Sequence, residues 1–268
     1  MKYSNGGVLI TKLEELPDLR NLDVLFLDVE TTSGNKDLKS TNPWHNSYLL
    51  GICIGDMENS YYIPVGHNRG GNLPWGEVYK WLEEVITTAK LWVNHNIKYD
   101  MHAISINLGI EINIPVFCTM TQAKIIDSDR LRGYGLDDLA RDWLGYDISH
   151  HEKALAPYLK YNKDYGWIPA DVLGYYGTDD VIATRMLYLH IMRNMPDECV
   201  SLSGQENDVT HALYLIERNG MNIDVQDTQL VQLQTIKSML EISEQIRQLL
   251  GYDINPTCLL YTSDAADE

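Results

Sequence analysis

Apolar residues in the first half of the chain fall into short blocks that are separated by polar, turn-rich segments. Short apolar blocks bounded by Gly, Pro, Asn and Asp are typical of β-strands. Blocks of this kind lie at residues 24–27, 47–55, 61–65, 91–93 and 116–119. The second and third are separated by a short polar run and predict a hairpin. The first runs directly into acidic residues, which predicts a buried strand with carboxylates at its carboxyl end.

Helical periodicity replaces this pattern between and after the strands. Apolar side chains recur at helical spacing after Pro74, and the pattern predicts further helices at about 99–107, 119–128, 135–144 and 169–193. Residues 145–168 are rich in His, Tyr, Lys and Gly and predict an irregular segment. The order of strands and helices predicts an α/β fold with a mixed sheet flanked by helices.

The pattern changes again after residue 195. Residues 204–219 and 226–250 predict two helices, each followed by a glycine, and no strand is predicted beyond this point. This all-α segment is interpreted as the start of another domain.

Composition narrows the class of protein. The 268 residues are 44% hydrophobic and 22% charged, as in an ordinary globular protein. No apolar run is long enough for a membrane span, and the N-terminus lacks a secretory pattern, so we expect a cytoplasmic protein without membrane contacts. The formal net charge of −17 argues against a protein that coats duplex nucleic acid. It does not argue against an enzyme whose metal ions supply the local positive charge.

Two carboxylates stand at the end of the first predicted strand. Asp28 and Glu30 are alternate residues, so they point to the same face. Adjacent carboxylates repel each other and are costly to hold together without a cation. A solvated strand end could carry the same residues, but the apolar block before Asp28 favours a buried strand.

Two further pairs have helical spacing. Asn96 and Asp100 are four residues apart at the start of a predicted helix, which would place them on one face. Asn96 as a helix cap and Asp100 as a first-turn acid would explain this pair equally well. Tyr176 and Asp180 have the same spacing beside an apolar stripe, where a carboxylate needs a partner. A core tyrosine and a surface acid are the alternative.

The three patterns together, in this order, resemble the DnaQ-like exonuclease superfamily of the tyrosine (DEDDy) type. The sequence around these patterns is most similar to the proofreading domain of family A DNA polymerases, of the bacterial and phage polymerase I type. The similar segments are FLDVETT from residue 26, NIKYD from residue 96 and YGTDD from residue 176. YGLDDLA from residue 134 also matches. The family has a threonine four residues after its last aspartate, and Thr184 fits Asp180 rather than Asp179.

The resemblance implies an RNase H-like fold and a site that binds two divalent cations, Mg²⁺ or Mn²⁺. Asp28 would bridge the two ions, Glu30 and Asp180 would complete one, and Asp100 would hold the other mainly through water. Tyr176 would orient the attacking water. Three residues, Thr31, Asn96 and Tyr99, would lie near the terminal nucleotides of the substrate, and Lys98 is either a phosphate contact or a solvated lysine.

The resemblance also implies partners and boundaries. The substrate would be the single-stranded 3′ end of a DNA primer, and the missing polymerase half would be part of the full-length protein. We expect residues 1–195 to form the exonuclease domain and residues 196–258 the truncated first helices of the polymerase domain. Residues 259–268 resemble a non-native tail. We expect a monomer, in the host cytoplasm if a phage encodes it.

Two alternatives stay open. An exoribonuclease of the same fold, similar to ribonuclease D, would have the same acids, although residues 205–224 resemble polymerase sequence. A non-catalytic nucleic-acid-binding domain would have lost acids that this chain retains.

Overall fold

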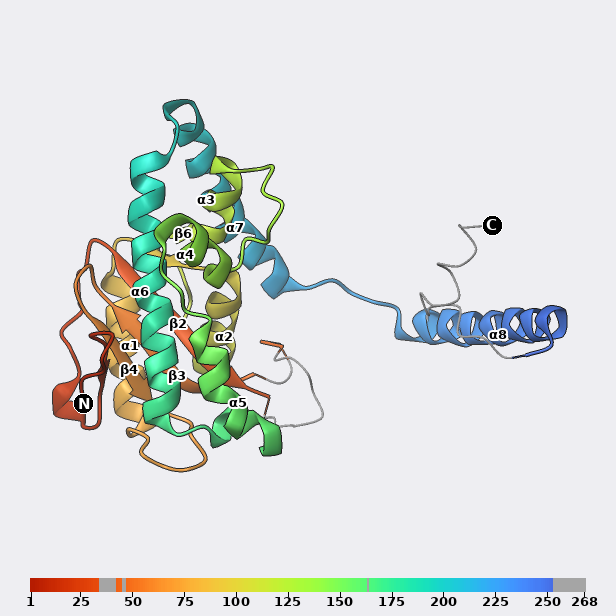
Figure 1. Ribbon diagram of the computed structural model, residues 1–268, viewed down its shortest axis with the longest axis horizontal. Helices are drawn as coiled ribbons and strands as arrows, with labels where there is room; N and C mark the ends of the chain where they lie inside the picture. Colours follow the sequence, from red (N-terminus) through yellow and green to blue (C-terminus); the bar gives the residue numbers. More distant parts are fainter. Residues whose placement is uncertain (34–41, 45–46, 163, 253–268) are drawn as a thin grey trace. The chain divides into compact units, whose positions relative to one another are not determined.

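The computed structural model describes residues 1–33, 42–44, 47–162 and 164–252. The chain divides into two compact units, Met1–Arg218 and a second unit that begins at Asn219. The first unit is built on a six-stranded sheet of order β1-β4-β3-β2-β5-β6 (Figure 1). Its strands are β1 (Val8–Leu9), β2 (Leu25–Thr32), β3 (Tyr48–Gly55), β4 (Ser60–Pro64), β5 (Trp92–Asn94) and β6 (Val116–Cys118).

The central strand β2 has neighbours of both directions. It pairs antiparallel with β3, which continues into β4, and parallel with β5, which is parallel to β6. The sheet is therefore mixed, as the sequence predicts. Strand β2 is buried on both faces, which explains its continuous apolar start: Leu25, Phe26 and Leu27 are all fully buried.

Helices cover both faces of this sheet. One face packs against α1 (Trp75–Thr88) and α2 (Lys98–Leu108). The other face packs against α3 (Thr119–Ile126), α4 (Leu136–Leu144), α5 (His150–Asn162) and the long helix α6 (Ala170–Asn194). Figure 1 shows α6 crossing the sheet near β2, β3 and β4.

Alternation along β2 decides which side chains face which helices. Leu25, Leu27 and Val29 belong to the core cluster that contains α1 and α2. Phe26 belongs to the cluster that contains α6. Because side chains alternate along a strand, Asp28 shares its face with Phe26 and is directed toward α6.

Helix α6 approaches the sheet closely because it carries small residues on its inner side. A Cβ atom on Gly174 would lie 2.4 Å from the hydroxyl of Tyr3 and 2.5 Å from the ring of Tyr62. No side chain fits into that space, so the glycine allows the helix and the sheet to come into contact.

Most predicted elements are confirmed within a few residues, but the prediction that residues 145–168 are irregular is wrong. It contains α5 and a short 3-10 helix at Tyr165–Trp167. Among its described side chains α5 buries only Leu155, and it contains Pro157, so the sequence shows no helical stripe and carries a helix breaker. The two-residue strand β1 was not predicted because it is too short for any periodic signal.

The predicted helices after residue 195 are also present. Helix α7 (Val200–Asn219) packs on the first unit, where Tyr214 is fully buried, so the compact unit extends past residue 195 to Arg218. The predicted domain boundary at residue 195 stays a prediction. Helix α8 (Val225–Leu250) belongs to the second unit. Residues 253–268, with the predicted tail, lie outside the described residues.

Within the described residues, no helix combines the length and the apolar character that a membrane crossing requires.

Candidate active site

The carboxylates of β2 lie beneath α6. Glu30 is buried with 7% of its surface exposed, and Asp28 is partly exposed. Asp28 is paired with Cys53 of β3, and Glu30 is paired with Gly51. The register between β2 and β3 shifts by one residue directly after Glu30. Such a bulge bends the strand at the point where the acids end.

Asp100 reaches the same site from the first turn of α2. Its carboxylate accepts a hydrogen bond of 3.0 Å from the backbone N–H of Val29, so the helix is attached directly to β2. Asp100 is 3% exposed. The structure therefore brings this acid next to Asp28, as the sequence predicts.

Asn94 connects these two acids and was missed in the sequence. Its side-chain amide donates to Asp28 Oδ1 at 3.0 Å and to Asp100 Oδ2 at 2.8 Å. Asn94 is the last residue of β5, which runs parallel to β2. Its position at the end of an apolar strand is the signal that could have identified it, because parallel strands end at the same edge of a sheet.

Asn96 does not lie on a helical face with Asp100, and this expectation was wrong. Asn96 is exposed and precedes the helix in a left-handed conformation, with φ 55°. Helix α2 starts only at Lys98, and Ile97 occupies the cap position. The backbone between β5 and α2 turns at Asn96, so the four-residue spacing does not correspond to a helical turn.

The other predicted substrate residues lie near one another. Thr31 Oγ1 and the Tyr99 hydroxyl are 2.6 Å apart, at the end of β2. Lys98 lies on the same helix, but its amino group pairs with Glu217 of α7. Glu217 also contacts His102 Nε2 at 2.7 Å. No local pattern indicates that an acid of α7 would pair with Lys98.

Helix α6 contributes Tyr176 and Asp180. The Tyr176 hydroxyl hydrogen-bonds to Asp180, one turn away. The helix can approach β2 and β3 here because of Gly177: a Cβ on this residue would lie 2.1 Å from Cys53 Sγ and 3.1 Å from Glu30 Oε1. Asp180 is thereby held near the acids of β2.

Tyr175 and Asp179, the neighbouring pair with the same spacing, make their contacts outside the cluster of acids. Asp179 is 1% exposed and accepts hydrogen bonds from the Tyr146 hydroxyl and, at 3.3 Å, from Asn5. Tyr175 packs edge-on against Tyr3, with ring centroids 5.7 Å apart. Asp179 therefore joins α6 to the N-terminal segment, and its carboxylate already has two donors.

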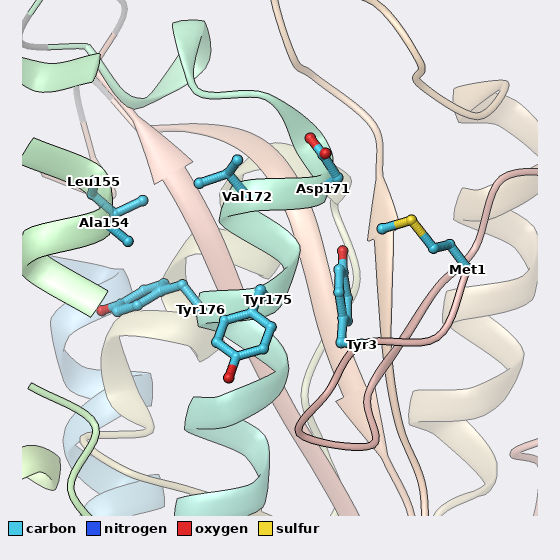
Figure 2. A pocket seen from close by; sticks show the side chains of 8 residues that line it. All are labelled: Met1, Tyr3, Ala154, Leu155, Asp171, Val172, Tyr175 and Tyr176. Carbon is cyan, nitrogen blue, oxygen red and sulfur yellow. The ribbon is translucent and has the colours of Figure 1, made fainter. Parts of the chain in front are cut away.

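A pocket of about 300 Å³ separates these two tyrosines from α5 and the N-terminus. Figure 2 shows that Tyr176 extends toward Ala154 and Leu155, whereas Tyr175 lies on the side of Tyr3. The two rings therefore point away from α6 in different directions, and only Tyr176 is paired with Asp180.

The four acids perturb one another strongly. Burial raises the pKa of Asp28 to about 6 and raises the pKa values of Glu30, Asp100 and Asp180 well above their ordinary range. The charge of Asp28 adds to the rise in the other three. The pKa of Tyr176 is raised first by the charge of Asp180 and then by burial. Such crowding of carboxylates favours a bound cation.

The chemistry of the donors fits a hard divalent cation. Asn94 joins the carboxylates of Asp28 and Asp100, Asp180 interacts electrostatically with Asp28, and ligand atoms of Asp28 and Glu30 lie within 4.8 Å of each other. Mg²⁺ and Mn²⁺ prefer such oxygen ligands. The arrangement can bind metal and polarise a phosphate ester.

Comparison with known proteins supports this assignment. The sequence model of the DNA polymerase A exonuclease domain, described as a 3′–5′ exonuclease, matches residues 10–196. A DNA-directed DNA polymerase of Pseudomonas phage M6 is 26% identical over 258 residues, which are 90% of this chain and 38% of that protein. The chain thus spans little more than a third of the length of this relative.

Two solved structures share the fold. Brucella melitensis NrnC bound to pGG superposes with a TM-score of 0.57 at 18% identity, covering 82% of this chain and 97% of that one. Escherichia coli RNase D, an exoribonuclease involved in structured RNA processing, superposes with a TM-score of 0.53 at 14% identity, covering 80% and 51%. Both confirm the predicted RNase H-like fold, and at these identities they carry no further conclusion.

Proposed function

Since the chain belongs to the 3′–5′ exonuclease family of DNA polymerase A, we propose that it removes nucleotides from the 3′ end of single-stranded or frayed DNA. The observation that carries this proposal is the convergence of four acids, Asp28, Glu30, Asp100 and Asp180, with Tyr176 on one of them. The product would be a nucleoside 5′-monophosphate.

The acids would hold two divalent cations, Mg²⁺ or Mn²⁺. When bound, such a pair of ions stabilises the entering and leaving oxygens of a phosphoryl displacement and lowers the pKa of bound water. Asp28 would contact both ions, Glu30 and Asp180 would complete one site, and Asp100 would hold the other mainly through water. Asn94 fixes the carboxylates of Asp28 and Asp100 relative to each other, since its one amide nitrogen donates to both.

The remaining residues act on water and on the terminal nucleotide. Tyr176, whose pKa is raised, keeps its hydroxyl proton and donates it to Asp180, so its hydroxyl oxygen can accept a hydrogen bond from the attacking water and orient it. Thr31 and Tyr99 form a hydrogen-bonded pair at the end of β2 that would contact the last sugar and base. Lys98 would reach phosphate only by leaving Glu217.

DNA is proposed over RNA because the relative from phage M6 is a DNA polymerase. Proofreading, as part of a polymerase in the host cytoplasm, follows from the same likeness and is proposed with it. An exoribonuclease is the second candidate, since E. coli RNase D has the same fold. Matched single-stranded DNA and RNA oligonucleotides of one sequence, labelled at the 5′ end, decide between them. Faster shortening of the RNA would contradict the proposed substrate.

The site assignment is tested by two neighbouring acids on α6. We expect Asp180→Asn to lower the rate of Mg²⁺-dependent cleavage by about 10³-fold, because ions in such sites supply several kcal/mol of transition-state stabilisation. Asp179→Asn is the matched control, since that carboxylate faces Tyr146 and Asn5 and should keep most of the activity. Cleavage is measured with Mg²⁺, Mn²⁺ and EDTA. Equal activity of Asp180→Asn and the unaltered protein would refute the site.

A further inference from the structure

A cysteine lies inside the acidic cluster. Cys53 of β3 lies opposite Asp28 of β2 in the sheet. The Sγ atom of Cys53 and one carboxylate oxygen each of Asp28 and Glu30 lie within 4.8 Å of one another. Three ligands at such distances need to close by only about 1 Å to bind one ion with bonds of about 2.0–2.3 Å.

Within the part of the chain that the structure describes, the side chains of Glu30 and Cys53 have no hydrogen-bonding partner. Glu30 is buried, with 7% exposure, and no hydrogen bond or ion pair of its carboxylate occurs among the described residues. Cys53 is fully buried, and its thiol likewise has no hydrogen bond in the part of the chain that the structure describes. A buried, unpartnered carboxylate beside a buried thiol is costly unless a cation binds both.

Gly177 shows that the two groups point into one space. The position of its absent Cβ lies 2.1 Å from Cys53 Sγ and 3.1 Å from Glu30 Oε1. The sulfur and the carboxylate oxygen are therefore on the same side of the sheet, under α6. A cation between them would complete its coordination with Asp28.

We propose that Cys53, Asp28 and Glu30 form a binding site for a thiophilic divalent cation, Zn²⁺ or Cd²⁺. The inference rests on the proposed function only in that Asp28 and Glu30 are taken to bind metal. A thiolate selects soft and borderline cations, whereas Mg²⁺ uses oxygen ligands alone. On binding, the thiol releases its proton to solvent and a metal–sulfur bond replaces the S–H bond.

The site has a consequence for regulation of the nuclease. A Zn²⁺ ion held by Cys53 would take Asp28 and Glu30 from the Mg²⁺ sites. Zinc should therefore compete with Mg²⁺, and the thiol should set the strength of that competition. The ligand set leaves one position of a tetrahedral Zn²⁺ open to water or phosphate.

The test uses the whole chain without metal and is a titration with Cd²⁺, followed by the ultraviolet charge-transfer absorption of the cadmium–thiolate bond. We expect the band to saturate at one equivalent. Cys53→Ser and Cys53→Ala should both lose it. Cys118→Ser is the matched control, because this thiol is also buried but lies at the end of β6 outside the group, and it should keep the band.

Calorimetric titration with Zn²⁺ gives the second measurement. Loss of a mere supporting group costs about 10–100-fold in metal affinity, so we expect Cys53→Ser to weaken Zn²⁺ binding by at least about tenfold. Circular dichroism checks that each variant is folded. An unchanged cadmium band and unchanged Zn²⁺ affinity in both folded Cys53 variants would overturn the proposal.

The outcomes separate this inference from the proposed nuclease. A cadmium–thiolate band in a protein that never cleaves DNA with Mg²⁺ would contradict the nuclease and support the thiol site. Mg²⁺-dependent cleavage by the unaltered protein, without a cadmium–thiolate band, would support the nuclease and contradict the thiol site.

Discussion

Replacing one carboxylate of the site should make the metal-free protein more stable. Asp28→Asn keeps the size of the side chain and an oxygen that can accept the hydrogen bond of Asn94. It removes a charge that burial disfavours and that raises the pKa values of Glu30, Asp100 and Asp180. A change that abolishes activity is thus expected to raise the free energy of unfolding.

The magnitude follows from the pKa of Asp28. The folded protein raises it from 3.8 to about 6, or by about 2 units at about 1.4 kcal/mol each, which is an upper value of about 3 kcal/mol. Water and side-chain adjustment reduce this cost, so we expect a gain of about 1–3 kcal/mol, or about 2–12 °C in Tm.

The sign depends on pH. Between 3.8 and about 6 the folded protein binds more protons than the unfolded chain, so its stability falls as the pH rises through this window. The full penalty is present above about pH 6 and absent below about pH 4. The free energy of unfolding of Asp28→Asn should therefore exceed that of the unaltered protein at about pH 8. At low pH the two values should approach each other.

The assay is urea or thermal unfolding in EDTA at about pH 5 and about pH 8, repeated with Mg²⁺. Bound Mg²⁺ should stabilise the unaltered protein, by about 2.7 kcal/mol at a hundred times its Kd, and Asp28→Asn much less. Asp208→Asn, an exposed acid of α7, is the control for loss of one charge. A variant at Asp28 that is less stable than the unaltered protein in EDTA at about pH 8 would refute the reasoning.

Three further changes test the site. Tyr176→Phe should lower kcat by about 10²-fold, and the same change at Tyr175 should have little effect; steady-state kinetics measures both. Gly177→Ala should cost about 1–3 kcal/mol of stability because its Cβ meets Cys53 Sγ at 2.1 Å, and Cys53→Ala should recover much of that loss in urea unfolding; additive losses would contradict the contact. Glu217→Gln frees the amino group of Lys98 and should tighten binding of single-stranded DNA several-fold at low salt by fluorescence anisotropy, with no change expected if Lys98 is only a surface lysine.

The sequence was sufficient wherever the determining interactions are local. An apolar block that ends in Asp28 and Glu30 predicts a buried strand with both acids on one face, because strand periodicity is two residues. The long helix over residues 170–193 and the pairing of Tyr176 with Asp180 follow from helical spacing in the same way.

The same local rules failed where the chain bends or lacks a periodic stripe. Asn96 has helical spacing to Asp100 but lies in a left-handed turn before the helix. Helix α5 buries too few of its described apolar side chains to produce a pattern. A spacing rule holds only if the backbone is helical throughout, and the sequence does not reveal where that condition ends.

Contacts between distant segments were decided by the tertiary structure alone. Asn94 reaches Asp28 across 66 positions, Asn5 reaches Asp179 across 174, and Glu217 reaches Lys98 across 119. No local pattern encodes such pairs, because they depend on which strand ends and helix faces the fold brings together.

The sequence by itself thus determined the acids, their strand and helix, and the family. The fold decided what surrounds them: an amide that bridges two acids, and a thiol on the adjacent strand. Periodicity reports which face a side chain occupies, whereas its neighbours are set by the packing of whole elements.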